Sequence, residues 1–325
     1  METRQTFEKA TLTPLNELIN DFLEYVEIER GRSPHTIEVY KRYLRRFSGW
    51  LSENYPDVGH PEDIDLDMVR KYRLFLAHLC NNKDKPLKKV TQGYHIIALR
   101  AFLRYLSVHR DIPTLTPDKI ELPKNDSKMV SFLNSEQVER LINAPNTSTI
   151  TGIRDRAILE TLFSTGLRVS ELVGLNRDQI NLERKEFGII GKGKKPRVVF
   201  LSNVAAASIE HYLNTRNDPF KPVFLRHSGH EDRERDGEKM RLTPRWVQKI
   251  VSKYATKCGL PLRASPHTLR HSFATDLLIS GADIRSVQEM LGHESIRTTQ
   301  VYTHVTDSKL REVHKAFHGK NRGAE

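Results

Sequence analysis

Cysteine is scarce in this sequence, which limits the ways in which the chain can be cross-linked. Only Cys80 and Cys258 occur, they lie far apart, and they form no C-x-x-C pair. Neither a disulfide framework nor a zinc site is therefore indicated. No acidic cluster with metal-ligand spacing accompanies the candidate site residues that are described below, so we expect no metal and no other cofactor.

Long apolar runs are also missing. No segment approaches the roughly 20 apolar residues of a transmembrane helix, and Met1–Thr13 lacks the apolar core of a signal peptide. We expect a soluble, cytoplasmic protein that has no membrane partner.

Positive charge is what the sequence has in excess. The 325 residues include 52 Lys and Arg against 41 Asp and Glu, which gives a formal net charge of +11 and a pI of about 9.5. This balance predicts a polyanionic partner, most simply nucleic acid, although a basic protein without such a partner is the alternative. The length is sufficient for two domains.

The first part of the chain has the pattern of a small helical bundle. Apolar residues recur at helical spacing in four segments that polar loops separate. Gly31 ends the first segment and Ser33 can cap the second, while Tyr94 and Ile97 belong to the expected apolar stripe of the fourth. The expected helices are Leu15–Arg30, the segment that follows Ser33, about Leu66–Leu79 and about Val90–Val108.

Basic residues crowd the remaining surface of this bundle. Such runs are usually solvated helix faces, but a basic surface can also follow the phosphates of DNA. The candidate DNA-binding residues of this part are Lys41, Arg42, Arg45, Arg46, Lys88, Lys89, Arg100 and Arg104.

Residues 111–132 differ in character from both neighbouring parts. Three prolines, scattered charge and the absence of a sustained period are typical of a linker. A second folded unit then begins with Asn134 or Ser135 as a helix cap. The expected division is a tail at 1–13, a helical domain at 14–110, a linker at 111–132, a second domain at 133–306 and a C-terminal tail or helix at 307–325.

The segment Gly152–Leu175 carries the first candidate site residue of the second domain. Its apolar pattern predicts a buried helix that Gly166 ends, with Arg168 in the turn that follows. Glu171 lies three residues further on, where it can pair with Arg168 and orient the guanidinium group.

The segment Phe187–Leu201 predicts a β-hairpin. β-Branched and apolar residues flank a tip of glycine and lysine, G-K-G-K-K, which contains Lys192. A lysine-rich tip is also common surface chemistry. Lys194 and Lys195 are candidates for contact with a DNA backbone.

Two further elements are expected before the C-terminal motifs. Val223–Leu225 predicts a short strand, and Leu242–Gly259 predicts a helix with Trp246 among its inward-facing residues. Arg245 and Lys249 lie on another face of this helix that could follow phosphates.

The stretch Ser265–Val305 gathers groups that suit phosphate chemistry. Ser265 can cap a helix, and Asp283 and Gly292 can bound the next one. Any one candidate alone would more often be an ordinary packed or surface residue, because functional residues are few in a chain. The candidates are two potential proton carriers, one permanent cation and one phenol, namely His267, His293, Arg270 and Tyr302.

The order of the motifs is more specific than any single residue. H-x-L-R-H, then L-G-H, then T-T-Q-V-Y-T-H follow one another, after T-G-L-R-V-S-E-L and G-K-G earlier in the chain. This set resembles the tyrosine recombinase (lambda integrase-like) family, and the residues of its motifs are closest to those of the Xer branch. The resemblance implies a mainly α fold with a small three-stranded sheet. An N-terminal SAM-like helical bundle would be the core-binding domain and the second domain the catalytic one.

The resemblance also implies roles for the candidate residues. The arginines and His293 would bind the scissile phosphate, and the tyrosine would attack it, with His267 as base and Lys192 as the acid for the leaving 5′-oxygen. Planar guanidinium forks suit phosphate oxygens, and preorganised cations can stabilise the charge of the transition state. The active-site residues so implied are Arg168, Lys192, His267, Arg270, His293 and Tyr302.

The implied reaction is cleavage and rejoining of a duplex DNA recombination site through a 3′-phosphotyrosyl bond and a four-way junction, without metal or ATP. A tetramer would form through the C-terminal segment, where Leu310, Val313 and Phe317 make a narrow apolar stripe. The resemblance also allows a partner recombinase or an accessory protein. Chromosome-dimer resolution and the integration or excision of a mobile element use the same active site.

Two other classes of function share parts of these motifs. A type IB topoisomerase-like relaxing enzyme would use the same tyrosine chemistry without assembling two sites. A non-catalytic DNA-binding protein of the same fold would have little reason to retain all six active-site residues.

Overall fold

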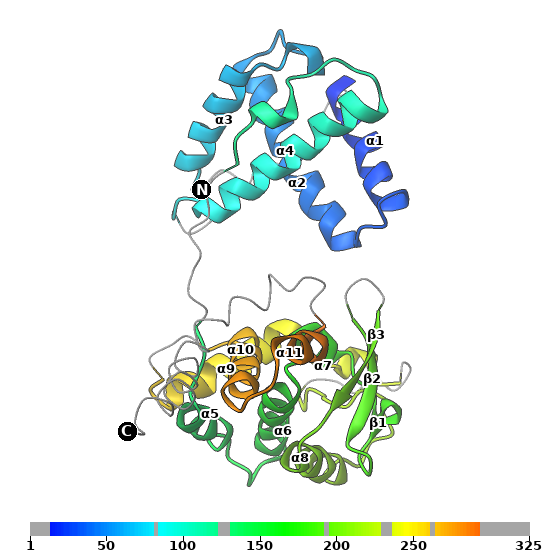
Figure 1. Ribbon diagram of the computed structural model, residues 1–325, viewed down its shortest axis with the longest axis vertical. Coiled ribbons are helices and arrows are strands. Elements are labelled where there is room, and N and C mark those ends of the chain that lie inside the picture. The colour runs from blue at the N-terminus through cyan, green and yellow to red at the C-terminus, as the bar shows by residue number, and fades with distance from the viewer. Residues whose placement is uncertain are drawn as a thin grey trace, which may run out of the picture. The chain divides into compact units, whose positions relative to one another are not determined.

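The computed structural model describes residues 14–80, 84–122, 131–191, 195–228, 236–260 and 264–292. The chain divides into two compact units, Met1–Ser127 and Lys128–Glu325, each with its own hydrophobic core (Figure 1). Among the described residues, no helix combines the length and the apolar character that crossing a membrane requires.

The first unit is an all-helical bundle, as the sequence predicts. Ser33 caps the second helix by accepting a hydrogen bond from the backbone N of Thr36 at 3.3 Å, and Gly31 has a φ of +56° where the first helix ends. Aromatic and aliphatic side chains from all four helices fill the core, including Phe22, Phe47 and Phe102. The helices are α1 Pro14–Ile28, α2 Pro34–Asn54, α3 Leu66–His78 and α4 Lys89–His109, with 3₁₀ turns at Pro61–Asp63 and Pro117–Lys119.

The expected apolar stripe of α4 is wrong at two positions. Tyr94 is 52% exposed and Ile97 is 37% exposed. The stripe that packs in the core follows Ile96, Leu99 and Phe102 instead. Each residue of a helix is turned by about 100° from the preceding one, so Tyr94 and Ile97 lie beside the buried face and not within it.

The second unit packs helices around a small sheet. In Figure 1 the three strands lie at one side of this unit, with α8 beside them and α6 near the centre. The strands are antiparallel in the order β1-β2-β3. The elements are α5 Ser135–Ile142, α6 Ile150–Thr165, α7 Val169–Val173, β1 Ile180–Asn181, β2 Glu186–Ile190, β3 Pro196–Phe200, α8 Asn203–Asn214, α9 Pro244–Lys257, α10 Pro266–Ile279 and α11 Ile284–Leu291, with 3₁₀ turns at Arg177–Gln179 and Glu238–Met240.

The predicted hairpin is present, and its two faces differ. Phe187 and Val199 oppose each other across β2 and β3, and both are buried on the inner face. On the outer face Ile190, Val198 and Phe200 are 74%, 54% and 58% exposed. This alternation is the period of two that a half-buried sheet requires.

Two expectations about the later elements are wrong. Val223–Leu225 is buried but forms no strand, and isolated bridges occur at the preceding Pro222 and at Leu225. The Arg216 guanidinium takes up the carbonyls of Pro222 and Val223, each at 2.7 Å, which leaves them unable to pair in a sheet. Trp246 is 52% exposed, since it lies one position off the buried face of α9, and Lys249 Nζ lies 4.9 Å from the centre of its ring.

Gly166 ends α6 in a conformation that other residues adopt at a cost. Its φ is +59°, and a Cβ at this position would lie 2.4 Å from Cδ1 of Phe273 on α10. The glycine therefore permits both the left-handed turn and the close approach of α10.

We expect Gly166→Ala to be more destabilising than Gly259→Ala. Gly259 has nearly the same φ, +61°, but no atom lies within 4 Å of the added Cβ. Gly259→Ala should therefore lower the free energy of unfolding only by the left-handed strain of about 1 kcal/mol. Gly166→Ala should cost about 2 kcal/mol more because Phe273 must move. Urea unfolding measures both losses. Equal losses would show that Phe273 adjusts freely.

Candidate active site

Two arginines from different segments converge on the end of α11. Arg168 Nη2 donates to the carbonyl oxygen of Gly292 at 3.1 Å, and Arg270 Nη2 donates to that of Leu291 at 2.6 Å. The last carbonyls of a helix lack partners within the helix and form its negative end. The structure therefore brings together the two predicted phosphate ligands and the backbone that precedes His293 in the sequence.

Local signals set the positions of both arginines. Ser265 caps α10 and places Arg270 just after its first turn, where the residue is only 3% exposed. Arg168 is the N-cap residue of α7, directly after the turn that Gly166 makes. Arg270 Nη1 also donates to the carbonyl oxygen of Gly166 at 2.5 Å, so this arginine connects the turn after α6 with the end of α11.

The predicted pair of Arg168 and Glu171 is confirmed. Arg168 Nη1 donates to Glu171 Oε1 at 2.9 Å, and the backbone N of Arg168 donates to Oε2 at 2.8 Å. Burial alone would raise the pKa of Glu171, but hydrogen bonds from Arg197 and Arg168 outweigh it and hold the pKa below its usual value. Glu171 is thus a carboxylate that fixes the direction of the Arg168 guanidinium.

Sequence reasoning missed a third arginine at this site. Arg197 on β3 donates from Nη1 and Nη2 to the two carboxylate oxygens of Glu171, at 3.1 and 2.9 Å. It pairs with Ile189 across the sheet and occupies the inner face, like Val199. The sequence does contain a signal for it, because side chains alternate between the two faces of a strand and Arg197 falls on the inward-facing side. A charge at such a position needs a buried partner.

His267 lies close enough to both arginines to respond to their charge. The residue is exposed on the first turn of α10. Partial desolvation, then Arg270 and Arg168, lower the pKa of His267 below its usual value. Its ring centre lies 6.5 Å from that of His271, whose pKa falls to about 4 through burial and through His267 and Arg270. A neutral imidazole at this position can accept a proton.

Four of the predicted site residues lie outside the described residues. These are Lys192, Lys194, His293 and Tyr302, and the segment 307–325 lies outside as well. Lys195 is described and exposed, and its carbonyl oxygen accepts a hydrogen bond from the backbone N of Gly191 at 2.8 Å. Within the described ranges, no group of three or more His, Cys, Asp or Glu side chains could hold a metal ion.

The predicted DNA-binding residues of the first unit differ in exposure and in their partners. The Arg46 guanidinium lies 3.2 Å from Nε2 of buried His95, and Arg100 forms an ion pair with Asp118. Burial, then Arg46 and Arg42, lower the pKa of His95 to about 3. The exposed candidates are Lys41, Arg42, Arg45, Lys88, Lys89 and Arg104, and in the second unit Arg245 and Lys249 are exposed on α9.

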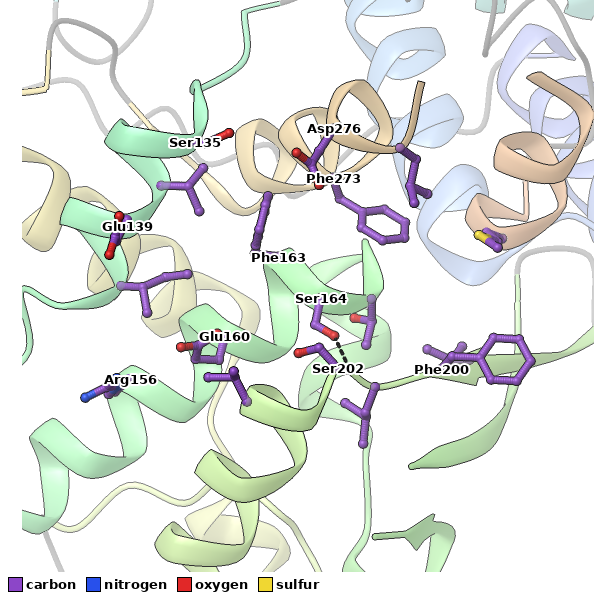
Figure 2. Close-up of a pocket in the computed structure, with 18 of the residues that line it drawn as sticks. Ser135, Glu139, Arg156, Glu160, Phe163, Ser164, Phe200, Ser202, Phe273 and Asp276 are labelled. Carbon is purple, nitrogen blue, oxygen red and sulfur yellow. Dashed lines mark hydrogen bonds between the residues drawn. The ribbon is translucent and has the colours of Figure 1, made fainter. Parts of the chain in front are cut away.

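The second unit also has a cavity of about 710 Å³, whose lining includes Arg156 but not Arg168, Arg197 or Arg270 (Figure 2). Its lining is mainly apolar and comes from α5, α6, α10 and α11 together with β3 and the start of α8. Phe163, Phe200 and Phe273 contribute aromatic surface, and Glu160 and Asp276 contribute carboxyl groups. Burial raises the pKa of Glu160.

Comparison with protein families and with individual proteins gives one consistent result. Residues 131–309 match the phage integrase family and residues 19–109 match the phage integrase N-terminal SAM-like domain. The chain is 38% identical over 316 residues to tyrosine recombinase XerC of Pelobacter propionicus, covering 97% of this chain and 99% of that protein. It is 37% identical over 311 residues to tyrosine recombinase XerD of Listeria innocua, covering 94% and 99%.

The chain belongs to the phage integrase family. The predicted resemblance to tyrosine recombinases of the Xer branch is thereby confirmed, and site-specific recombination is favoured over a relaxing enzyme or a non-catalytic binding protein.

Solved structures of tyrosine recombinases and integrases support the fold of this recombinase. The XerH site-specific recombinase bound to palindromic difH substrate aligns with a TM-score of 0.71 at 21% identity, covering 97% of this chain and 99% of that one. The Tn1549 transposon integrase in complex with transposon right end DNA aligns with a TM-score of 0.68 at 16% identity, covering 91% and 99%. The mainly α architecture with a three-stranded sheet is therefore confirmed.

We expect Arg168→Ala to raise the pKa of His267. Removing a neighbouring cation removes a cause that disfavours the charged imidazole, so the pKa should move up toward the ordinary value of about 6.5. NMR titration of the histidine ring protons measures this shift. Arg184→Ala, which changes an exposed residue of the β1–β2 turn, should leave the pKa unchanged. No upward shift in Arg168→Ala would contradict the described proximity.

Proposed function

We propose that this recombinase cleaves and rejoins duplex DNA at specific sites through Tyr302. The observation that carries the proposal is the convergence of Arg168 and Arg270 on the carbonyls of Gly292 and Leu291. A guanidinium has five N–H donors, and the described bonds leave donors on Arg168 to bind a phosphate. The carbonyls hold both groups in place before DNA binds, which is the preorganisation that stabilises developing negative charge.

The remaining active-site residues attack the phosphate and transfer the protons during cleavage. The Tyr302 oxygen attacks the phosphorus and forms a 3′-phosphotyrosyl bond while the bond to the 5′-oxygen breaks. His267 takes the phenol proton and Lys192 gives a proton to the leaving oxygen, while His293 binds a phosphate oxygen. The lowered pKa of His267 supports its role as base, since the imidazole is then neutral near pH 7.

The reverse attack completes the reaction. A 5′-hydroxyl from a second duplex attacks the phosphorus and gives its proton to Lys192, while the bond to the Tyr302 oxygen breaks and His267 returns a proton to the phenol. One phosphoester bond is exchanged for another at each step, so the reaction needs no ATP. The preorganised arginines stabilise the negative charge that a metal ion stabilises in other enzymes. The formal charge of +11 and the exposed basic residues on α2, α4 and α9 support binding to duplex DNA. Solved relatives of the same fold are bound to their recombination substrate or transposon end.

We infer that four protomers assemble and that the cavity of Figure 2 takes the C-terminal segment of a neighbour. The segment carries the apolar stripe Leu310, Val313 and Phe317 among several basic residues. The cavity offers apolar and aromatic surface together with the carboxyl groups of Glu139, Glu160 and Asp276 against one arginine, Arg156, so it is complementary to the segment in both respects. Packing of an amphipathic segment into such a groove buries apolar area and pairs opposite charges.

We expect Tyr302→Phe to abolish covalent capture of DNA and to leave DNA binding intact. The phenyl ring keeps its shape but lacks the attacking oxygen. The assay incubates the protein, without metal or ATP, with nicked duplexes that carry candidate sites from its own genome and detects adducts that resist denaturation. Tyr94→Phe, which removes an exposed hydroxyl from α4, should capture normally. Capture by Tyr302→Phe would refute Tyr302 as the nucleophile.

We expect Val198→Glu to weaken assembly without abolishing cleavage. Val198 lines the cavity, and burying an unpaired carboxylate there should cost about 2 kcal/mol or more. Analytical ultracentrifugation of the protein on duplex sites should show at least about a 10-fold loss of tetramer. Ile190→Glu changes another exposed residue of the same sheet face, outside the cavity lining, and should assemble normally. Equal assembly of the two variants would exclude this cavity as the docking site.

A further inference from the structure

Arg197 connects three segments that carry or precede proposed active-site residues. Its two terminal nitrogens bind both oxygens of Glu171, whose Oε1 also binds Nη1 of Arg168. The Arg197 side chain is 11% exposed and that of Glu171 is 8% exposed. A bidentate bond with so little solvent fixes both the distance and the angle between β3 and α7.

The same guanidinium packs closely on two glycines. A Cβ on Gly292 would lie 2.8 Å from Nη1 of Arg197, and a Cβ on Gly191 would lie 3.0 Å from the same atom. Gly191 precedes Lys192 in the hairpin and Gly292 precedes His293 after α11. Glycine at both positions therefore allows the Arg197 side chain to lie against the backbone on either side.

The environment of Arg197 is costly for an arginine that serves packing alone. Its Nε is buried and has no hydrogen-bond partner among the described residues. An apolar side chain at this inner sheet position would avoid burying that group and the charge. A role in the reaction accounts for its presence better than stability does.

We propose that Arg197 is a positioning residue that holds strands β2 and β3 against the Arg168–Glu171 pair, and that the role of Lys192 in the reaction depends on this anchor. The inference rests on the proposed function, in which Lys192 protonates the 5′-oxygen that leaves. Arg197 does not touch the DNA in this assignment. It acts through Glu171 on one side and through Gly191 on the other.

The leaving group offers a way to isolate this role. When sulfur replaces the bridging 5′-oxygen, the group that leaves is a thiolate, which is far less basic than an alkoxide and needs no proton from an acid. A variant in which Lys192 is missing or misplaced should therefore capture the oxygen substrate more slowly and the sulfur substrate at the wild-type rate. Loss of a phosphate ligand such as Arg168 should matter on both.

The experiment measures the rate of covalent capture by the full-length protein on two nicked duplexes that differ only in this bridging atom. The variants are Arg197→Met, which keeps the length of the side chain, Lys192→Ala, Arg168→Ala and the control Arg184→Met. We expect Arg197→Met to lose about 100-fold on the oxygen duplex and to approach the wild-type rate on the sulfur duplex, as Lys192→Ala does. Arg184→Met should match the wild type on both duplexes.

Several outcomes would overturn the proposal. An equal loss on both duplexes, as expected for Arg168→Ala, would show that Arg197 does not act through Lys192, and no loss on either would remove its role altogether. A Lys192→Ala variant that sulfur does not rescue would overturn the role of Lys192 and this proposal with it. A wild-type protein that captures neither duplex would refute the proposed function itself.

A second variant covers the case in which Arg197→Met does not fold. Arg197→Lys keeps the charge and can restore one of the two hydrogen bonds to Glu171. It should show the same selective defect on the oxygen duplex at a smaller size. Thermal unfolding and DNA affinity close to those of the wild type, together with that pattern, separate positioning from a general loss of structure, and a loss on both duplexes would again overturn the proposal.

Discussion

The arrangement of the second unit depends on two guanidinium groups that share the end of one helix. Arg168 and Arg270 come from separate segments, and like charges at close range repel. Three features offset the repulsion: the carbonyls of Leu291 and Gly292, the negative end of α11 to which they belong, and the carboxylate of Glu171. Because these contacts also join the turn after α6 to α10 and α11, the residues that bind the charge also hold the helices together.

Most of the site's framework follows from local signals that a sequence displays directly. Ser265 caps α10 and Asp283 caps α11, while Gly166 and Gly292 end their helices at positive φ. Once these boundaries are set, the helical period decides where Arg270 and His267 project. The pairing of Arg168 with Glu171 is also local, since three residues separate them. These features could be predicted because each depends on neighbours in the chain.

The wrong or missing expectations depend on contacts between distant segments. The apolar run Val223–Leu225 resembles a strand, but Arg216 takes up the carbonyl of Val223 and that of the preceding Pro222, and only isolated bridges form. Trp246 and Tyr94 each lie beside the buried face of a helix, and the phase of such a face is decided by what packs against it. Arg197 was missed for the same reason, because its partner Glu171 lies on another element and only the alternation of β3 marks the position as buried.

The balance of charge around Glu171 fits the proposed reaction better than it fits a resting phosphodiester. Arg168, Arg197 and Arg270 bring three positive charges, and Glu171, kept ionised by its lowered pKa, neutralises one. These four side chains therefore have a net charge of about +2, and Arg168 and Arg270 are the two that bind the phosphate in the proposed reaction. A phosphodiester carries about one negative charge, whereas the pentavalent transition state carries about two, so attraction rises as the tyrosine attacks. A site without Glu171 would bind the ground state more strongly, and Arg168 and Arg197 would lose the carboxylate that they share. In the proposed reaction the carboxylate would therefore act by limiting the positive charge as well as by orienting it.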